Sequence, residues 1–188
     1  QHKRQCQLSD YRLCRPSRLP YQPARRTQRC AISLSYEGLF EMSIRLILMR
    51  HANSDWHLGV PDHARPLNTR GRQASTALGG WLRHNQYLPD EIISSTAART
   101  LETCDLLKLD TQPRTSGKLY LASHNAMLDV LRTATGQTVL MLGHNPGICA
   151  FARGLLASPP NHLRFEDYPS GATLIAGFKQ TEWLQIKW

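Results

Sequence analysis

The pattern of apolar and polar positions along the chain predicts strands and helices that alternate between residues 44 and 178. Short apolar runs bounded by charged or turn residues are typical of buried strands. Longer segments with apolar positions three or four residues apart are typical of half-buried helices. The predicted strands are 46–49, 91–94, 118–122 and 138–142, followed by an antiparallel pair at 171–178 and 183–188.

Four helices are predicted, one after each of the first four strands. Their predicted ranges are 70–85, 97–107, 125–133 and 146–156. A regular strand–helix alternation indicates an α/β domain whose central sheet is mostly parallel. We therefore expect a single-domain three-layer sandwich with helices on both faces of the sheet.

Residues 1–42 differ in composition from the rest of the chain. They hold eight Lys or Arg against three acids, so they carry +5 of the total formal charge of +9. They show no periodic apolar face, and we expect a flexible basic arm ahead of a domain at 43–188. Because Met42 directly precedes the first strand, a start-site artefact or dispensable tail is favoured over a transit peptide or polyanion-binding arm.

Charge and cysteine content narrow the class of protein. The domain is only mildly basic and has no stripe of basic and aromatic residues, so we expect no nucleic-acid partner. The five cysteines follow no zinc or CxxC spacing, which favours a reducing, cytoplasmic compartment. There is no apolar run of about 18 residues, and we expect no membrane span. The oligomeric state is left open.

Polar side chains follow the predicted parallel strands where each strand ends. Arg50 and His51 come directly after the first strand, Arg99 lies in the first turn after the second, and His144 follows strand 138–142. The carboxyl ends of parallel strands meet at one edge of the sheet, where ligands bind. Guanidinium groups match phosphate oxygens in shape and charge. These four residues therefore predict a pocket for a tetrahedral dianion.

The first loop contains a histidine series that does not look like a metal site. His51, His57 and His63 recur every six residues, which places them on no common helix face. No cysteine or carboxylate cluster completes a ligand set. We expect neither a metal nor a cofactor.

Four segments together resemble the histidine phosphatase superfamily, which has the phosphoglycerate-mutase-like fold. Within it, the chain is most similar to the small bacterial phosphohistidine phosphatases. The segments are 46–51 (Leu-Ile-Leu-Met-Arg-His), 65–71 (Arg-Pro-Leu-Asn-Thr-Arg-Gly), 95–103 (Ser-Thr-Ala-Ala-Arg-Thr-Leu-Glu-Thr) and 143–147 (Gly-His-Asn-Pro-Gly). They occur in the family's order, and the resemblance spans about residues 44–178.

The resemblance implies a phosphatase with a covalent intermediate. Neutral His51 attacks phosphorus in line and becomes phosphorylated, and water then hydrolyses the phospho-imidazole. Arg50, Arg99 and His144 bind the phosphoryl oxygens and offset their charge. Asn53, just past the nucleophile, is expected to touch the phosphate. Asn145 is instead expected to cap the helix that follows it.

The chain departs from the family pattern at two places. Ala52 follows the Arg-His pair where the family usually has Gly, as is common in the small phosphohistidine phosphatases. Thr96 stands where the family has Pro after Ser; it can still cap the helix, and Ser94 and Ser95 are the other candidate caps.

The substrate is expected to be phosphohistidine on a protein. Only 48 positions separate His51 from Arg99 and 45 separate Arg99 from His144, which leaves no room for a lid domain. Residues 118–127 contain no Asp or Glu to protonate an alkoxide, and Leu121 stands where some relatives carry Glu.

Two other readings stay open. A phosphatase or mutase could act on a small phosphate ester if Asp55 or Asp62 supplied the acid. A catalytically silent phosphate-binding module is disfavoured, because none of the four core residues is lost.

Overall fold

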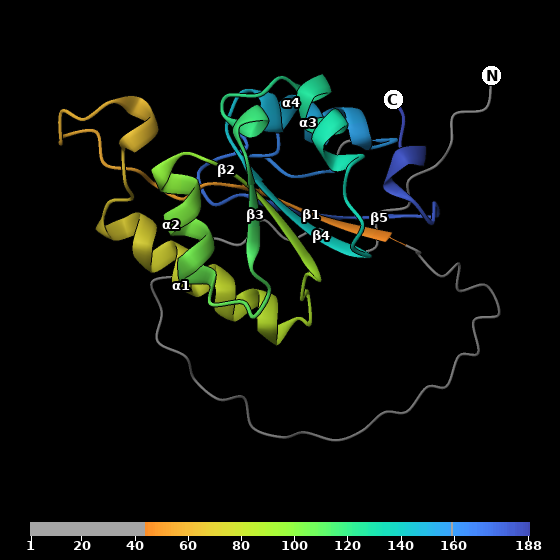
Figure 1. Ribbon diagram of the computed structural model, residues 1–188, viewed down its shortest axis with the longest axis horizontal. Coiled ribbons are helices and arrows are strands. Elements are labelled where there is room, and N and C mark those ends of the chain that lie inside the picture. The colour runs from red at the N-terminus through yellow and green to blue at the C-terminus, as the bar shows by residue number, and fades with distance from the viewer. Residues whose placement is uncertain (1–43, 159) are drawn as a thin grey trace.

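A five-stranded sheet forms the middle layer of the protein (Figure 1). The computed structural model describes residues 44–158 and 160–188, so the predicted arm at 1–42 lies outside the described residues. The strands are β1 (Ile44–Arg50), β2 (Glu91–Ser95), β3 (Pro113–Ser116), β4 (Thr138–Gly143) and β5 (Thr173–Phe178). The sheet order is β3-β2-β4-β1-β5, and only β5 runs antiparallel to its neighbour.

Strand β1 lies inside the sheet between β4 and β5, and its register with β4 places the site. Its residues Leu46 to Met49 are fully buried, as expected for a strand covered on both faces. Arg50, the last residue of β1, lies opposite Gly143, the last residue of β4. The chain therefore leaves the sheet at the same level before His51 and before His144.

Two helices cover each face of the sheet. Helices α1 (Thr69–His84) and α2 (Ala98–Leu107) pack together on one side, and α3 (His124–Leu131) and α4 (Gly147–Leu155) on the other (Figure 1). No helix within the described ranges is both long and apolar enough to cross a membrane. The predicted three-layer α/β sandwich is confirmed.

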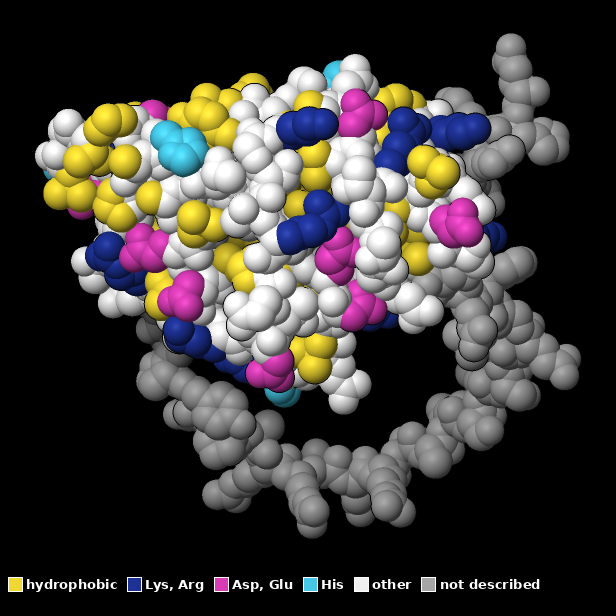
Figure 2. Space-filling model, in the orientation of Figure 1, with side chains coloured by type: hydrophobic (Ala, Val, Ile, Leu, Met, Phe, Trp, Pro, Cys, Tyr) yellow, Lys and Arg dark blue, Asp and Glu magenta, His cyan; other side chains and the backbone are white. Residues whose placement is uncertain are grey.

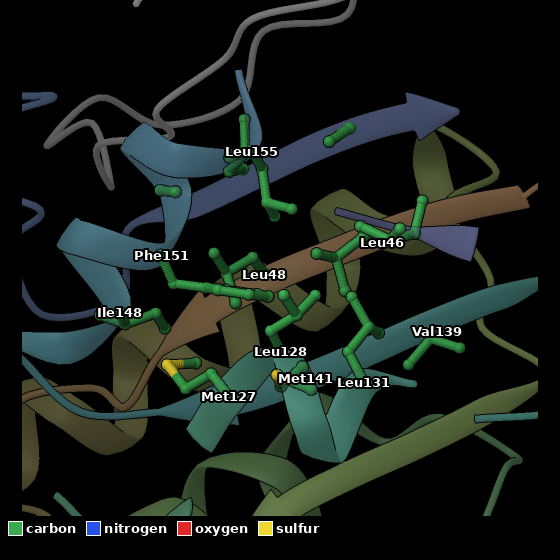
Figure 3. Packing of buried hydrophobic residues seen from close by; sticks show 14 of the residues in the cluster. Leu46, Leu48, Met127, Leu128, Leu131, Val139, Met141, Ile148, Phe151 and Leu155 are labelled. Atoms are coloured by element: carbon green, nitrogen blue, oxygen red, sulfur yellow. The ribbon is translucent and has the colours of Figure 1, made fainter. Parts of the chain in front are cut away.

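The alternation of side chains along β1 builds two cores. Leu46 and Leu48 join the cluster beneath α3 and α4, where Leu128 and Phe151 pack against them (Figure 3). Ile47 and Met49 point the other way and join the cluster beneath α1 and α2. Successive residues of a strand face opposite sides, so one apolar run supplies both layers.

The predicted edge strand at 118–122 is wrong. The edge strand is β3, five residues earlier, and Gly117–Leu119 form a 3-10 turn instead. Strand β3 has the sequence Pro-Arg-Thr-Ser and is largely exposed, so it carries no apolar alternation. Leu119 and Ala122 are apolar because they pack into the core beneath α3.

The second strand of the predicted closing pair is also wrong. Trp183–Gln185 form a 3-10 turn, and β5 pairs with β1 instead. Trp183 and Ile186 are buried against the core, and the Trp183 indole donates to the carbonyl of Gly136 at 2.6 Å. The apolar residues of 183–188 are therefore spaced for packing against the core and not for pairing as a strand.

Helix α1 begins close beneath the loop that carries Asn53. The side chain of Asn68 caps the helix by accepting from the backbone N–H of Gly71 at 2.8 Å. A Cβ at Gly71 would overlap the backbone carbonyl of Asn53, so only glycine permits this approach.

We predict that Gly71→Ala destabilises the protein by about 2 kcal/mol, because the added methyl group must push the Asn53 backbone aside. Gly80→Ala is the matched control on the same helix, since a Cβ there meets nothing within 4 Å. That control should stabilise by roughly 0.5–1 kcal/mol. Urea unfolding measures both, and equal effects of the two substitutions would contradict the close approach.

Candidate active site

All five residues predicted for the site line one pocket at the carboxyl end of the parallel strands. Arg50, His51, Asn53, Arg99 and His144 share a cavity of about 390 Å³. They come from the end of β1, the loop after it, the first turn of α2 and the residue following β4. The sheet therefore brings together side chains that lie up to 94 positions apart, from Arg50 to His144.

His51 is held in one tautomer, with its lone pair on Nε2 inside the pocket. Its Nδ1 lies 2.7 Å from the backbone carbonyl of Ala52, which can only accept, so Nδ1 carries the proton. Nε2 therefore has the lone pair, toward which the Nε–H of Arg99 points at 3.3 Å. Burial, reinforced by Arg99 and Arg50, lowers the pKa of His51 to about 4. The ring is neutral at pH 7, as a nucleophile requires.

His144 is neutral as well, with the opposite tautomer. Arg99 Nη2 lies 3.3 Å from its Nδ1, and because a guanidinium only donates, Nδ1 accepts. The proton is then on Nε2, which donates to Ser95 Oγ at 2.8 Å. Burial first, and then the neighbouring His51 and Arg99, lower the pKa of His144 to about 3. The two imidazole centroids are 5.1 Å apart.

Arg99 connects these groups from the first turn of α2. The residue is only 2% exposed, and its guanidinium contacts both histidines. It also donates to the backbone carbonyl of Asp62 at 2.6 Å and pairs with the Asp62 carboxylate at 3.0 Å. A cation opposes the helix dipole at this position, and the Asp62 carboxylate offsets that cost.

Arg50 and Asn145 meet at the loop before β5. Arg50 Nη1 donates to the carbonyl of Tyr168 at 2.9 Å, while its buried Nε has no partner among the described residues. The Asn145 amide donates to the carbonyls of Asp167 and Tyr168 at 2.9 and 3.1 Å. The predicted capping role of Asn145 is therefore wrong, because these two carbonyls engage its side chain and Pro146 occupies the cap position of α4.

The expected cap at Thr96 is also wrong. Its hydroxyl lies 2.9 Å from Nε2 of His63, and Ala97 occupies the cap position of α2 without a side-chain bond. The start of α2 is instead tied to β2 by the Thr100 hydroxyl, which donates to the Ser95 carbonyl at 2.9 Å.

Sequence reasoning missed the ion pair between Asp62 and Arg65 in the pocket wall. Arg65 is buried and donates to the Ser54 hydroxyl and, at 2.5 Å, to Asp62. The Tyr120 hydroxyl donates to the same carboxylate at 2.7 Å. The i, i+3 spacing of the pair, with Arg65 opening the segment 65–71, was the available signal.

The charge balance of the pocket suits an anion and disfavours proton donation by Asp62. Among the described residues that line the pocket, three carry a guanidinium group (Arg50, Arg65 and Arg99) and one, Asp62, carries a carboxylate. Hydrogen bonds from Arg65 and Tyr120 hold the pKa of Asp62 well below its usual range. Asp62 therefore stays ionised near neutral pH, and Asp55 does not line the pocket.

We predict that the protein loses stability as the pH falls from 7 to 5. His51 and His144 have folded-state pKa values of about 4 and about 3, below the usual 6.5, so the unfolded chain binds protons first in this range. Urea unfolding at pH 7, 6 and 5 measures the slope. His144→Gln should make it shallower, and an unchanged slope would show that burial of neutral His144 is not its cause.

Comparison with known proteins supports the resemblance to the histidine phosphatase superfamily. The family model of the histidine phosphatase superfamily (branch 1) matches residues 46–120. The uncharacterized protein Rv1276c of Mycobacterium tuberculosis is 35% identical over 106 residues, which cover 55% of this chain and 67% of the relative.

Solved structures extend the likeness over the whole domain. A structure described as a putative phosphohistidine phosphatase SixA from Nakamurella multipartitia is 30% identical with a TM-score of 0.63, covering 75% of this chain and 87% of that one. A putative SixA from Agrobacterium tumefaciens, 23% identical, shares the fold with a TM-score of 0.64 over 73% of this chain and 93% of its own. The four sequence segments, the pocket they build and these matches agree: the chain belongs to the histidine phosphatase superfamily.

Proposed function

We propose that this phosphatase removes phosphoryl groups from histidine side chains of proteins through a phospho-His51 intermediate. The observation that carries the proposal is the neutral His51 ring, with its Nε2 lone pair inside a pocket lined by three arginines. Membership of the superfamily supports phosphatase chemistry, and the relative of known structure described as a putative phosphohistidine phosphatase supports the substrate.

In the first step His51 Nε2 attacks phosphorus opposite the leaving group. The new P–Nε2 bond forms as the bond to the leaving group breaks, and the leaving group takes the bonding electron pair. The ring becomes positively charged, and the Nδ1–H bond to the Ala52 carbonyl stabilises that charge. The same bond keeps Nε2 unprotonated before the attack.

The arginines stabilise the charge that spreads over the phosphoryl oxygens. Arg50 has a buried Nε–H without a partner among the described residues, which a phosphoryl oxygen can satisfy. Arg99 contributes the Nε–H that faces His51. His144, fixed by Ser95, packs beside the nucleophile, and Asn53 contributes its amide from the pocket wall. Water then attacks phosphorus, and His51 leaves as the neutral ring.

The preference for phosphohistidine follows from the lack of a placed acid. Asp62, the carboxylate in the pocket, is held ionised by Arg65 and Tyr120. Leu121, which stands where some relatives carry Glu, lines the pocket. Imidazole is a far weaker base than an alkoxide, so its departure needs less protonation. We infer a cytoplasmic enzyme acting on phosphorylated proteins.

We predict that His51→Ala folds normally and loses at least about a thousandfold in kcat, because the attacking nitrogen is gone. Turnover of a phosphohistidine peptide measures the loss, and circular dichroism checks the fold. His57→Ala is the control, because that side chain is exposed and outside the pocket. Near wild-type turnover by His51→Ala would refute the nucleophile assignment.

We also predict a higher kcat/KM for a phosphohistidine peptide than for small alkyl phosphates, since only the ester needs a strong proton donor. Initial rates of phosphate release from both substrates at pH 7 give the comparison. Equal or higher efficiency on alkyl phosphates would favour the small-ester alternative and leave the His51 mechanism intact.

A further inference from the structure

Large apolar side chains are exposed around the mouth of the pocket. Trp56, Leu58 and Val60, on the loop between β1 and α1, are 75%, 54% and 41% exposed, and Leu121, in the turn before α3, is 56% exposed. We call these four residues the apolar rim. Hydrophobic side chains gather at the left end of the face in Figure 2, over the loop that projects there in Figure 1. Clustered exposed apolar side chains mark interaction surfaces.

The apolar rim begins inside the pocket and continues beyond it. Trp56 and Leu121 line the cavity together with His51 and Arg99, whereas Leu58 and Val60 do not. A small phosphorylated molecule that fills the cavity does not need the outer two residues. A substrate that covers them must extend out of the pocket along the loop, as a polypeptide does.

Trp56 is anchored to the charged network. Its ring stacks on the Arg65 guanidinium, 3.5 Å from the centroid, and Arg65 is buried and paired with Asp62. The loop is further tied down by the backbone N–H of Asp55, which donates to the Pro66 carbonyl at 2.9 Å. A surface fixed in this way binds without first paying an ordering cost.

Leu121 holds a backbone conformation that leucine rarely adopts. Its φ is +49°, and its side chain is exposed rather than packed in the core. Such outliers concentrate at binding sites, where the position of the side chain matters more than local stability. The strain at Leu121 is an observation independent of the exposed loop, and both lie at the pocket mouth.

We propose that the apolar rim binds an apolar polypeptide segment flanking the phosphorylated histidine of the substrate. The inference rests on the proposed function, because the phosphoryl group must occupy the pocket while the flanking residues contact the rim. The arginines recognise the phosphoryl group in any substrate, whereas the rim distinguishes one phosphoprotein from another.

Two phosphohistidine peptides that differ only in flanking residues test this, one with Leu, Val and Phe beside the histidine and one with Ser, Gly and Asn. The wild-type protein should prefer the apolar peptide at least about tenfold in kcat/KM, mainly through KM, which matches burial of the exposed halves of Leu58 and Val60. The double variant Leu58→Ser/Val60→Ser should lose this preference. It should hydrolyse phosphoramidate, which has no flanking residues, at the wild-type rate.

Leu88→Ser is the matched control, because Leu88 is as exposed as Leu121 but precedes β2, away from the pocket. It should keep the tenfold preference. Absence of a preference in the wild type, or its persistence in the double variant, would overturn the rim assignment. A wild type that elutes as a dimer in gel filtration, and a double variant that differs only in eluting as a monomer, would also overturn it, in favour of self-association. Failure of the wild type on both peptides and on phosphoramidate would contradict the proposed function itself.

Discussion

The buried guanidinium of Arg99 is the interaction on which the rest of the site depends. A charge that is almost fully removed from water is tolerated only when its donors are satisfied and its charge is balanced. Asp62 supplies the balance, and the two histidines accept from the remaining N–H groups. One side chain thereby links α2, the loop after β1 and the residue after β4. It also adds to the burial that keeps both imidazoles neutral, because protonating either would place a second positive charge beside it.

The same pocket keeps His51 neutral and able to attack, and keeps Asp62 ionised and unable to donate a proton. Burial lowers the pKa of His51 and leaves a lone pair for attack, while hydrogen bonds lower the pKa of Asp62 and leave no proton to give. The pocket is therefore built to accept a phosphoryl group and poorly built to assist a basic leaving group. The proposed preference for a P–N over a P–O bond rests on this asymmetry rather than on the shape of the cavity.

The sequence was most informative where an apolar run ends abruptly. The positions of Arg50, His51 and His144 follow from strands whose burial on both faces leaves a clear pattern, and Arg99 follows from the start of α2. The pairing of Asp62 with Arg65 had only their i, i+3 spacing as a signal, because the loop that holds them has no periodicity and is also shaped by the ion pair of Asp62 with Arg99. Asn145 was also misassigned because of contacts with a distant segment. Its side chain could cap a helix, but it donates instead to two carbonyls of the loop before β5. The prediction of strand β3 was wrong for a different reason. Its residues are polar and exposed, so the sequence has no alternating apolar positions there.

The pairing of Arg50 with Gly143 at the ends of β1 and β4 has a consequence for how such a protein can change over time. The register of β1 in the sheet is fixed, because a shift of one residue would turn every side chain of β1 to the opposite layer. Insertions in the loop between β1 and α1 do not change the distance in space between His51 and His144. An insertion or deletion inside either strand would move His51 and His144 apart. It would also turn the side chains beyond that point to the opposite face of the sheet. The mouth of the pocket can therefore diversify while the reacting groups stay in place.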